Sequence, residues 1–200
     1  MAYKNFKEKQ LKDDLGVTPK VVELFDTSKI PTVEPSPQLL RTLLEAQLIT
    51  LSTEKALSER IISPVLAEVK KNNLTRIQIF SGEIINADAE RGLNGEIDFI
   101  FTRLSDTISP QAPIICVTEA KIGRLDKAIP QASAQMVGAR VFNEKNGDAV
   151  ETIHGVITDG SVWRFLKLEG NTILIDKNQI FQNDLAKLLG VFQKIVDFYY

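Results

Sequence analysis

Two apolar runs carry embedded charges: Gly95-Glu-Ile-Asp-Phe-Ile-Phe-Thr-Arg103 and Pro113-Ile-Ile-Cys-Val-Thr-Glu-Ala-Lys121. Each run is short and rich in β-branched and aromatic residues, which predicts a strand. Glu119 and Lys121 are two residues apart, so on a strand they project from one face. If the runs form a hairpin across the loop 104–112, Asp98 faces that pair. Burying these charges is costly unless something pairs with them, and a divalent cation is the natural partner.

The pattern around these runs predicts an α/β fold with a mixed central sheet covered by helices. Residues 39–71 have helical spacing, with Ser52 or Thr53 available as an internal cap and Pro64 as a kink or restart. A second helix is expected from Pro130 to about Glu144, and a final amphipathic helix over roughly 181–198. Further strands are expected at 75–80, 152–158, 163–168 and 172–175.

The N-terminal region reads as a separate unit. Residues 3–25 have apolar positions that predict a helix, interrupted at Gly16 and Pro19. The stretch 27–38 contains three prolines and cannot form regular structure. We therefore expect an N-terminal helical arm and proline-rich linker over 1–38 and one domain over 39–200. Such an arm docks either on the core or on a second subunit, where it would hold a homodimer together.

The composition bounds the class of protein. The chain has 200 residues, 44% of them hydrophobic and 25% charged, which is ordinary for one globular domain. It contains one cysteine and one histidine, so Cys–His zinc sites and an internal disulfide are excluded. The sequence has no secretory signal and no apolar run of the roughly 20 residues that span a membrane, so a cytoplasmic location without membrane contact is expected.

The net charge is −2 and the pI is about 5.6, which argues against tight, nonspecific DNA binding as the main activity. The charge does not exclude a nuclease, because a cation held in an acidic cleft supplies local positive charge. No glycine-rich phosphate-binding pattern is present, so nucleotide-cofactor chemistry has no support.

The pattern Asp98…Glu119-Ala-Lys121 resembles the D…ExK signature of the PD-(D/E)xK nuclease superfamily, which has the restriction-endonuclease-like fold. Ile97 stands where the nominal motif has proline. Three segments also resemble a family of small uncharacterised bacterial proteins placed in that superfamily: Ser58-Glu-Arg-Ile-Ile-Ser-Pro-Val-Leu66, Gly92-Leu-Asn-Gly-Glu-Ile-Asp-Phe99 and Trp163-Arg-Phe-Leu-Lys-Leu-Glu-Gly170.

The resemblance implies a metal site. Asp98 and Glu119 would ligate Mg²⁺ or Mn²⁺ with the backbone carbonyl of Ala120. Lys121 would orient the attacking water or stabilise the charge that develops on the phosphate. Glu96 should face the same side as Asp98, as an outer group. The alternative is a buried Glu119–Lys121 ion pair that only closes the edge of a strand.

Two further positions match catalytic positions of the resembling families. Glu59 falls near Leu66 in helical projection, and a helical Glu at this place approaches metal-bound waters in those families. Its alternative is an exposed Glu paired with Arg60 or Ser63. Gln131 best matches a Gln that many superfamily members place after the ExK strand, and Gln135, four residues on, is the weaker candidate. A solvated helix face is the alternative for both.

The function expected from this resemblance is metal-dependent endonuclease hydrolysis of DNA phosphodiester bonds. A catalytically weak or inactive nuclease-fold module that binds nucleic acid or a protein partner is the alternative. A third reading is a structural partner whose arm holds a complex together. His154, on an apolar strand, is interpreted as a satisfied core or edge histidine, and Trp163 as core packing.

Overall fold

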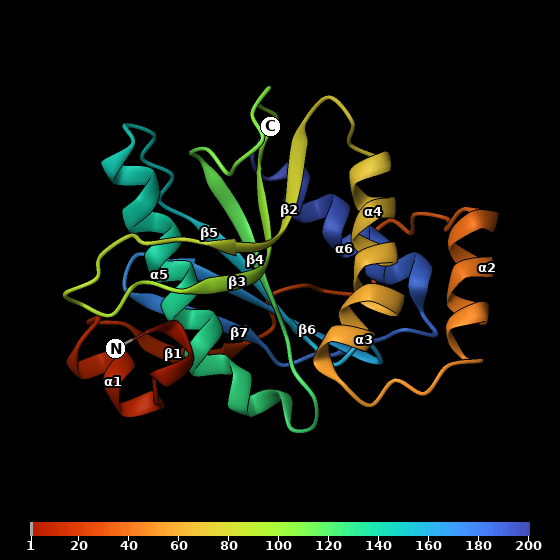
Figure 1. Cartoon of the computed structure of the whole chain (residues 1–200), viewed down its shortest axis with the longest axis horizontal. Helices are drawn as coiled ribbons and strands as arrows, with labels where there is room; N and C mark the ends of the chain where they lie inside the picture. Colours follow the sequence, from red (N-terminus) through yellow and green to blue (C-terminus); the bar gives the residue numbers. More distant parts are fainter. Residues whose placement is uncertain (1) are drawn as a thin grey trace.

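The computed structural model describes residues 2–200, in which a mixed eight-stranded sheet lies between two layers of helices (Figure 1). The α/β class with a mixed central sheet is therefore confirmed. The helical elements are η1 (Tyr3–Asn5), α1 (Glu8–Asp13), α2 (Pro37–Ala46), α3 (Glu54–Leu57), η2 (Ser58–Ile62), α4 (Ser63–Lys71), η3 (Leu125–Ala128), α5 (Ile129–Lys145) and α6 (Leu185–Asp197). The strands are β1 (Thr18–Val22), β2 (Ile77–Ile84), β3 (Glu96–Arg103), β4 (Ile114–Ala120), β5 (Ile153–Thr158), β6 (Val162–Glu169), β7 (Thr172–Asp176) and β8 (Ile180–Phe181).

The sheet order is β1-β7-β6-β5-β4-β3-β2. Strand β8 lies outside this order and pairs with the first two residues of β6. Strands β3 and β4 form the expected antiparallel hairpin. Strand β5 lies parallel to β4, so the chain must cross over between them, and α5 makes that crossover. The centre of the sheet is thus a β4–α5–β5 unit, in which α5 packs against β4.

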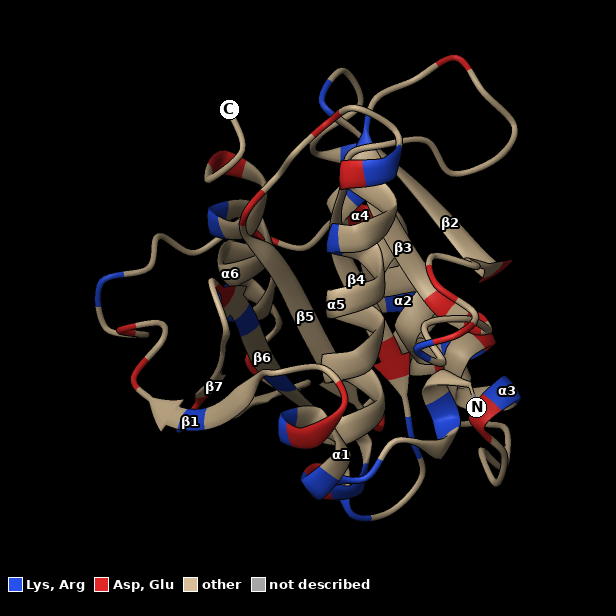
Figure 2. Cartoon of the chain, turned by 90° about the vertical axis from the view of Figure 1, so that its left-hand side faces the viewer, with Lys and Arg blue, Asp and Glu red and all other residues tan. Residues whose placement is uncertain are grey.

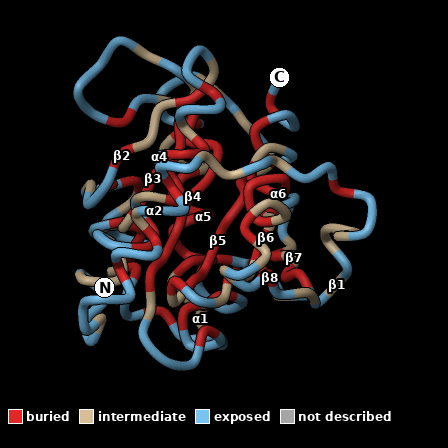
Figure 3. The backbone as a smooth tube through the Cα atoms, turned by 90° about the vertical axis from the view of Figure 1, so that its right-hand side faces the viewer, coloured by how far each residue is buried: buried red, intermediate tan, exposed pale blue. Residues whose placement is uncertain are grey.

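Each face of the sheet has its own apolar core. Val117 of β4 packs in a cluster with α5 and the N-terminal segment, whereas its neighbour Cys116 packs in a cluster with α2, α4 and α6. This alternation follows from the two-residue period of a strand. Figure 3 shows the strands and the inner sides of the helices buried, with exposed backbone in the surrounding loops.

The N-terminal region differs from the expected helix over 3–25. Helix α1 ends at Asp13, and residues 18–22 form β1, which pairs in parallel with β7. The reason is local: Gly16 takes a positive φ of 70° that ends the helical path, and β-branched residues follow it. Pro19 is tolerated because β1 is an edge strand.

The N-terminal segment docks on the core of its own chain, one of the two positions expected for it, because several of its apolar side chains are buried there. Tyr3 is buried against Gly138 of α5, where a Cβ atom would overlap the tyrosine ring. Phe6 and Leu11 are buried in the same cluster. In the linker, the Val33 N–H donates to the Ala186 carbonyl on α6 at 3.0 Å. Leu15 is buried in the core as well, whereas Val21 is 59% exposed, so a homodimer through this segment stays a prediction.

The helical stretch expected over 39–71 is divided. Thr53 does cap a new helix, accepting a hydrogen bond from the Ala56 N–H. The following turn, η2, is π-helical, and the Ser63 N–H donates to the carbonyl of Ser58. Pro64 follows this turn and has no N–H to continue the ordinary ladder. The final helix begins at Leu185 because 180–181 pair with β6 instead.

Candidate functional site

The β3–β4 hairpin brings Asp98 and Glu119 together. The register pairs Phe99 with Thr118, so Asp98 and Glu119 occupy the next position of the ladder. The Asp98 Oδ2 atom accepts a hydrogen bond of 2.7 Å from the Ala120 N–H. The two carboxylates that the sequence singled out are thus neighbours on adjacent strands, at the end of β4.

Glu119 lies in the layer between β4 and α5. Its side chain is only 4% exposed, and its Oε2 atom accepts a 2.7 Å hydrogen bond from Nε2 of Gln135. Gln135 is itself fully buried, and its Oε1 atom has no hydrogen-bond partner among residues 2–200. Gln131, the favoured candidate from the sequence, is half-buried one turn earlier on α5, and Gln135 makes the contact instead.

Lys121 stands just beyond β4. Its backbone N–H donates to the carbonyl of Thr158 at 2.8 Å, which continues the pairing with β5. Its Nζ atom lies 3.2 Å from Oε1 of Glu54, in the first turn of α3. The same Glu54 oxygen accepts a 3.3 Å hydrogen bond from the Ile122 N–H. The Glu119–Lys121 ion pair left open by the sequence is not formed, because Glu54 takes that role.

Glu59 does not reach this cluster. Its side chain is 58% exposed and pairs loosely with Lys55, at 3.9 Å. The residue lies in the π-helical turn η2, where each residue advances less around the axis than in an α-helix. The projection that aligned Glu59 with Leu66 assumed α-helical spacing across this turn, so it gave the wrong face. Glu54, which sequence reasoning passed over, approaches Lys121 from the same helical segment.

The site has an excess of negative charge. Burial, followed by the charge of Asp98, raises the pKa of Glu119 to about 8, against a smaller lowering effect of the Gln135 hydrogen bond. Burial also raises the pKa of Asp98, and the charges of Glu54 and Glu96 add to that effect. Both carboxylates are therefore costly to ionise together unless a cation is present.

Trp163 and His154, which the sequence predicts to be structural residues, lie apart from this cluster. Trp163 is fully buried and packs edge-on against Phe192, as expected for a core residue. His154 is 3% exposed, and its Nδ1 atom lies 2.7 Å from the hydroxyl of Tyr199. Burial and the charge of Lys167 lower the pKa of His154 to about 3, so its imidazole is neutral at pH 7.

Figure 2 shows acidic and basic segments interspersed on the side that carries α5. No helix within residues 2–200 is both long enough and apolar enough to cross a membrane. No protein-family model matches the chain, and no curated protein matches it either.

Proposed function

We propose that the chain is a metal-dependent nuclease of the PD-(D/E)xK type that hydrolyses DNA phosphodiester bonds. The observation that carries the proposal is the pair Asp98 and Glu119, which come from neighbouring strands and are both costly to ionise without a cation. Lys121, two residues beyond Glu119, supplies a cationic group beside the same strand end. This combination also supports the restriction-endonuclease-like version of the α/β fold.

The donor set fits a hard divalent cation. Within residues 2–200, no cluster of three or more His, Cys, Asp or Glu side chains is arranged for a metal ion. Mg²⁺ needs fewer protein ligands, because it keeps several waters and is typically held by one or two carboxylates. Asp98, Glu119 and the Ala120 carbonyl would hold it. When bound, the cation polarises the scissile phosphate and lowers the pKa of a bound water.

The protein's own residues would orient the ligands and balance charge. Gln135 fixes one oxygen of Glu119 through its amide N–H, which leaves the other oxygen available. The Ala120 N–H does the same for Asp98. Lys121 has an exposed partner in Glu54, so its ammonium group can exchange that carboxylate for a substrate phosphate and stabilise the charge that develops there.

The alternative is a module of the same fold that binds nucleic acid or a protein partner and cleaves weakly or not at all. Two observations favour it. The Nζ atom of Lys121 is already paired with Glu54, and the whole chain has a net charge of −2. A protein with that charge gains no general attraction to the phosphate backbone.

Cleavage assays on variants of Lys121 separate these functions. With Mn²⁺ and a panel of linear, nicked and single-stranded DNA, Lys121→Met should lower the cleavage rate by about a hundredfold, the scale of one lost transition-state contact. Lys55→Met is the matched control, because Lys55 lies on α3 and is 84% exposed. It should cleave like the wild type.

Calorimetric titration with Mn²⁺ accompanies that assay. If the wild type binds Mn²⁺ but cuts nothing in the panel, the nuclease proposal is overturned in favour of the binding module. If Asp98→Asn and Glu119→Gln bind Mn²⁺ as tightly as the wild type, the metal site itself is refuted.

A further inference from the structure

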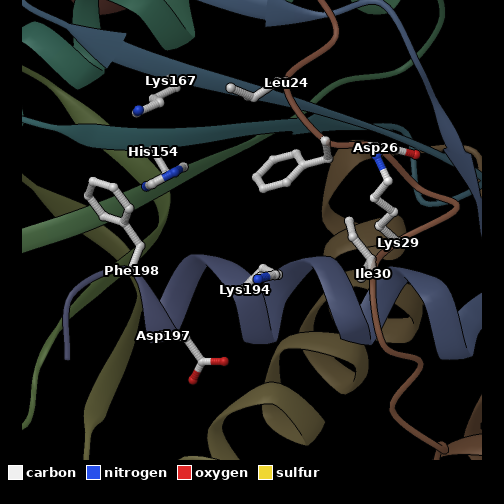
Figure 4. A pocket seen from close by; sticks show the side chains of 10 residues that line it. Leu24, Asp26, Lys29, Ile30, His154, Lys167, Lys194, Asp197 and Phe198 are labelled. Atoms are coloured by element: carbon white, nitrogen blue, oxygen red, sulfur yellow. Dashed lines mark ion pairs between the residues drawn. The ribbon is translucent and has the colours of Figure 1, made fainter.

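A second candidate site lies on the opposite face of the sheet from Gln135 and Glu119. It is a cavity of about 490 Å³ between the loop after β1, strands β5 and β6, and α6 (Figure 4). That volume is in the range of small-molecule sites, roughly 300–1,000 Å³. His154, Lys167 and Lys194 line it, together with the rings of Phe25 and Phe198. None of these side chains has a part in the proposed nuclease chemistry.

The buried His154 presents an unused hydrogen-bond acceptor to this cavity. The single hydroxyl proton of Tyr199 is directed at the carbonyls of Ile115 and Thr152, at 2.8 and 3.0 Å. Those carbonyls can only accept, so Nδ1 of His154 must donate to the tyrosine oxygen. The Nε2 atom therefore carries the free lone pair, and no residue in the part of the chain from 2 to 200 donates to it. A ligand N–H or O–H group fits that position.

Three lysines and two aspartates line the cavity, and one aspartate, Asp26, is paired with Lys29 at 2.8 Å, so the lysine left for an anion is Lys194. Lys194 of α6 makes no ion pair within residues 2–200, and Figure 4 shows it on the helix between His154 and Lys29. Lys167 of β6 lies above His154 in the same view, with Glu169 as its partner at 2.7 Å. Asp197 adds little negative charge, because its carboxylate points away below α6 and is bound to Arg76 at 2.7 Å.

Two aromatic rings form further walls of the cavity. Phe198 packs edge-on against His154, with ring centroids 5.3 Å apart, and Phe25 lies on another side at 6.5 Å. The loop that carries Phe25 is anchored by the buried carboxylate of Asp176, which accepts hydrogen bonds from the Leu24 and Phe25 N–H groups at 3.3 and 3.2 Å. Aromatic walls of this kind favour a planar ring.

We propose that this cavity binds a nucleoside monophosphate group. The base would lie against Phe25 and Phe198 and donate an N–H to Nε2 of His154, while the phosphate would bind Lys194 and Lys167. The same group occurs as a free nucleotide and as the 5′ end of a nucleic-acid strand. The proposal does not depend on the nuclease function, because it involves neither the carboxylate pair nor a metal.

Calorimetric titrations of the full chain in EDTA test the site, with AMP, adenosine and inorganic phosphate as probes. AMP should bind saturably, and adenosine and phosphate should each bind at least about tenfold more weakly, because each lacks one half of the contacts. Lys194→Met should weaken AMP binding by about tenfold or more. Lys187→Met, on the same helix but paired with Asp184, should leave it unchanged.

A short oligonucleotide, with and without a 5′-phosphate, distinguishes the sources of the group. If AMP binds and neither oligonucleotide does, the site takes free nucleotides. If the phosphorylated oligonucleotide binds through Lys194 and the unphosphorylated one does not, the site takes strand ends. The proposal is overturned if AMP shows no saturable binding, or if Lys194→Met binds AMP as tightly as the wild type does.

Discussion

Acidification should destabilise the fold through His154. The imidazole is buried, and that burial with the charge of Lys167 lowers its pKa from 6.5 to about 3. Because the folded-state pKa lies below the unfolded-state value, the stabilisation is fully present above pH 6.5 and is lost as the pH falls toward 3. Each pH unit within that window costs about 1.4 kcal/mol. Between pH 6.5 and pH 5 the contribution of His154 to the free energy of unfolding should therefore fall by about 2 kcal/mol.

The assay is urea unfolding of the wild type and of His154→Gln at several pH values between 5 and 7.5. Gln does not titrate, so the variant should lose about 2 kcal/mol less than the wild type over that interval, whatever its absolute stability. Carboxylates titrate in both proteins and cancel in the difference. Tyr199→Phe serves as the control: it removes the acceptor of the Nδ1 proton but keeps the titrating ring, so it should retain the wild-type pH slope. Equal slopes for the wild type and His154→Gln would refute the reasoning.

Three other predictions concern the candidate site and the N-terminal segment. Without metal at pH 7, Glu119→Gln should be as stable as the wild type or more so in thermal unfolding, because the pKa of Glu119 is raised to about 8 by burial and by the charge of Asp98, and the neutral Gln does not incur the cost of protonating this carboxylate on folding. Marked destabilisation would make the residue structural. Gln135→Leu should weaken Mn²⁺ binding about tenfold or more in calorimetry, whereas Gln131→Leu should not; equal effects would contradict the assigned contact. Deletion of residues 2–22 removes β1 and should abolish cooperative unfolding, and an unchanged melting temperature would show that this segment is dispensable.

The centre of the fold could be predicted because its signals are local. The runs around Asp98 and Glu119 are short, apolar and rich in β-branched residues. The loop between them is too short for a crossover connection, so the second strand is expected to return beside the first as a hairpin. The helix from Pro130 has a proline at its start and Asn146-Gly147 at its end, and α5 spans 129–145. Each of these elements is specified by residues within or beside it.

The N-terminal segment could not be predicted in this way. Its apolar residues are spaced closely enough to suggest a helix, and nothing local reveals that 18–22 pair with β7, more than half the chain away. Tyr3 is a second example, because its ring lies against Gly138 of α5, in space that a larger side chain at that position would fill. Contacts of this kind depend on the tertiary structure, which overrides local propensity.

Sequence periodicity cannot decide between Gln131 and Gln135, because it does not say how far along β4 each turn of α5 lies. Both residues lie on one face of α5, so their spacing alone treats them alike. The helix runs back along β4 after the short turn η3, and the length of that connection sets which helical turn lies beside Glu119. The second helical turn lies beside Glu119, about 5.4 Å further along the helix axis than the first. Because Gln135 is fully buried and bonded to Glu119, the carboxylate is oriented by the core of the protein rather than by its surface.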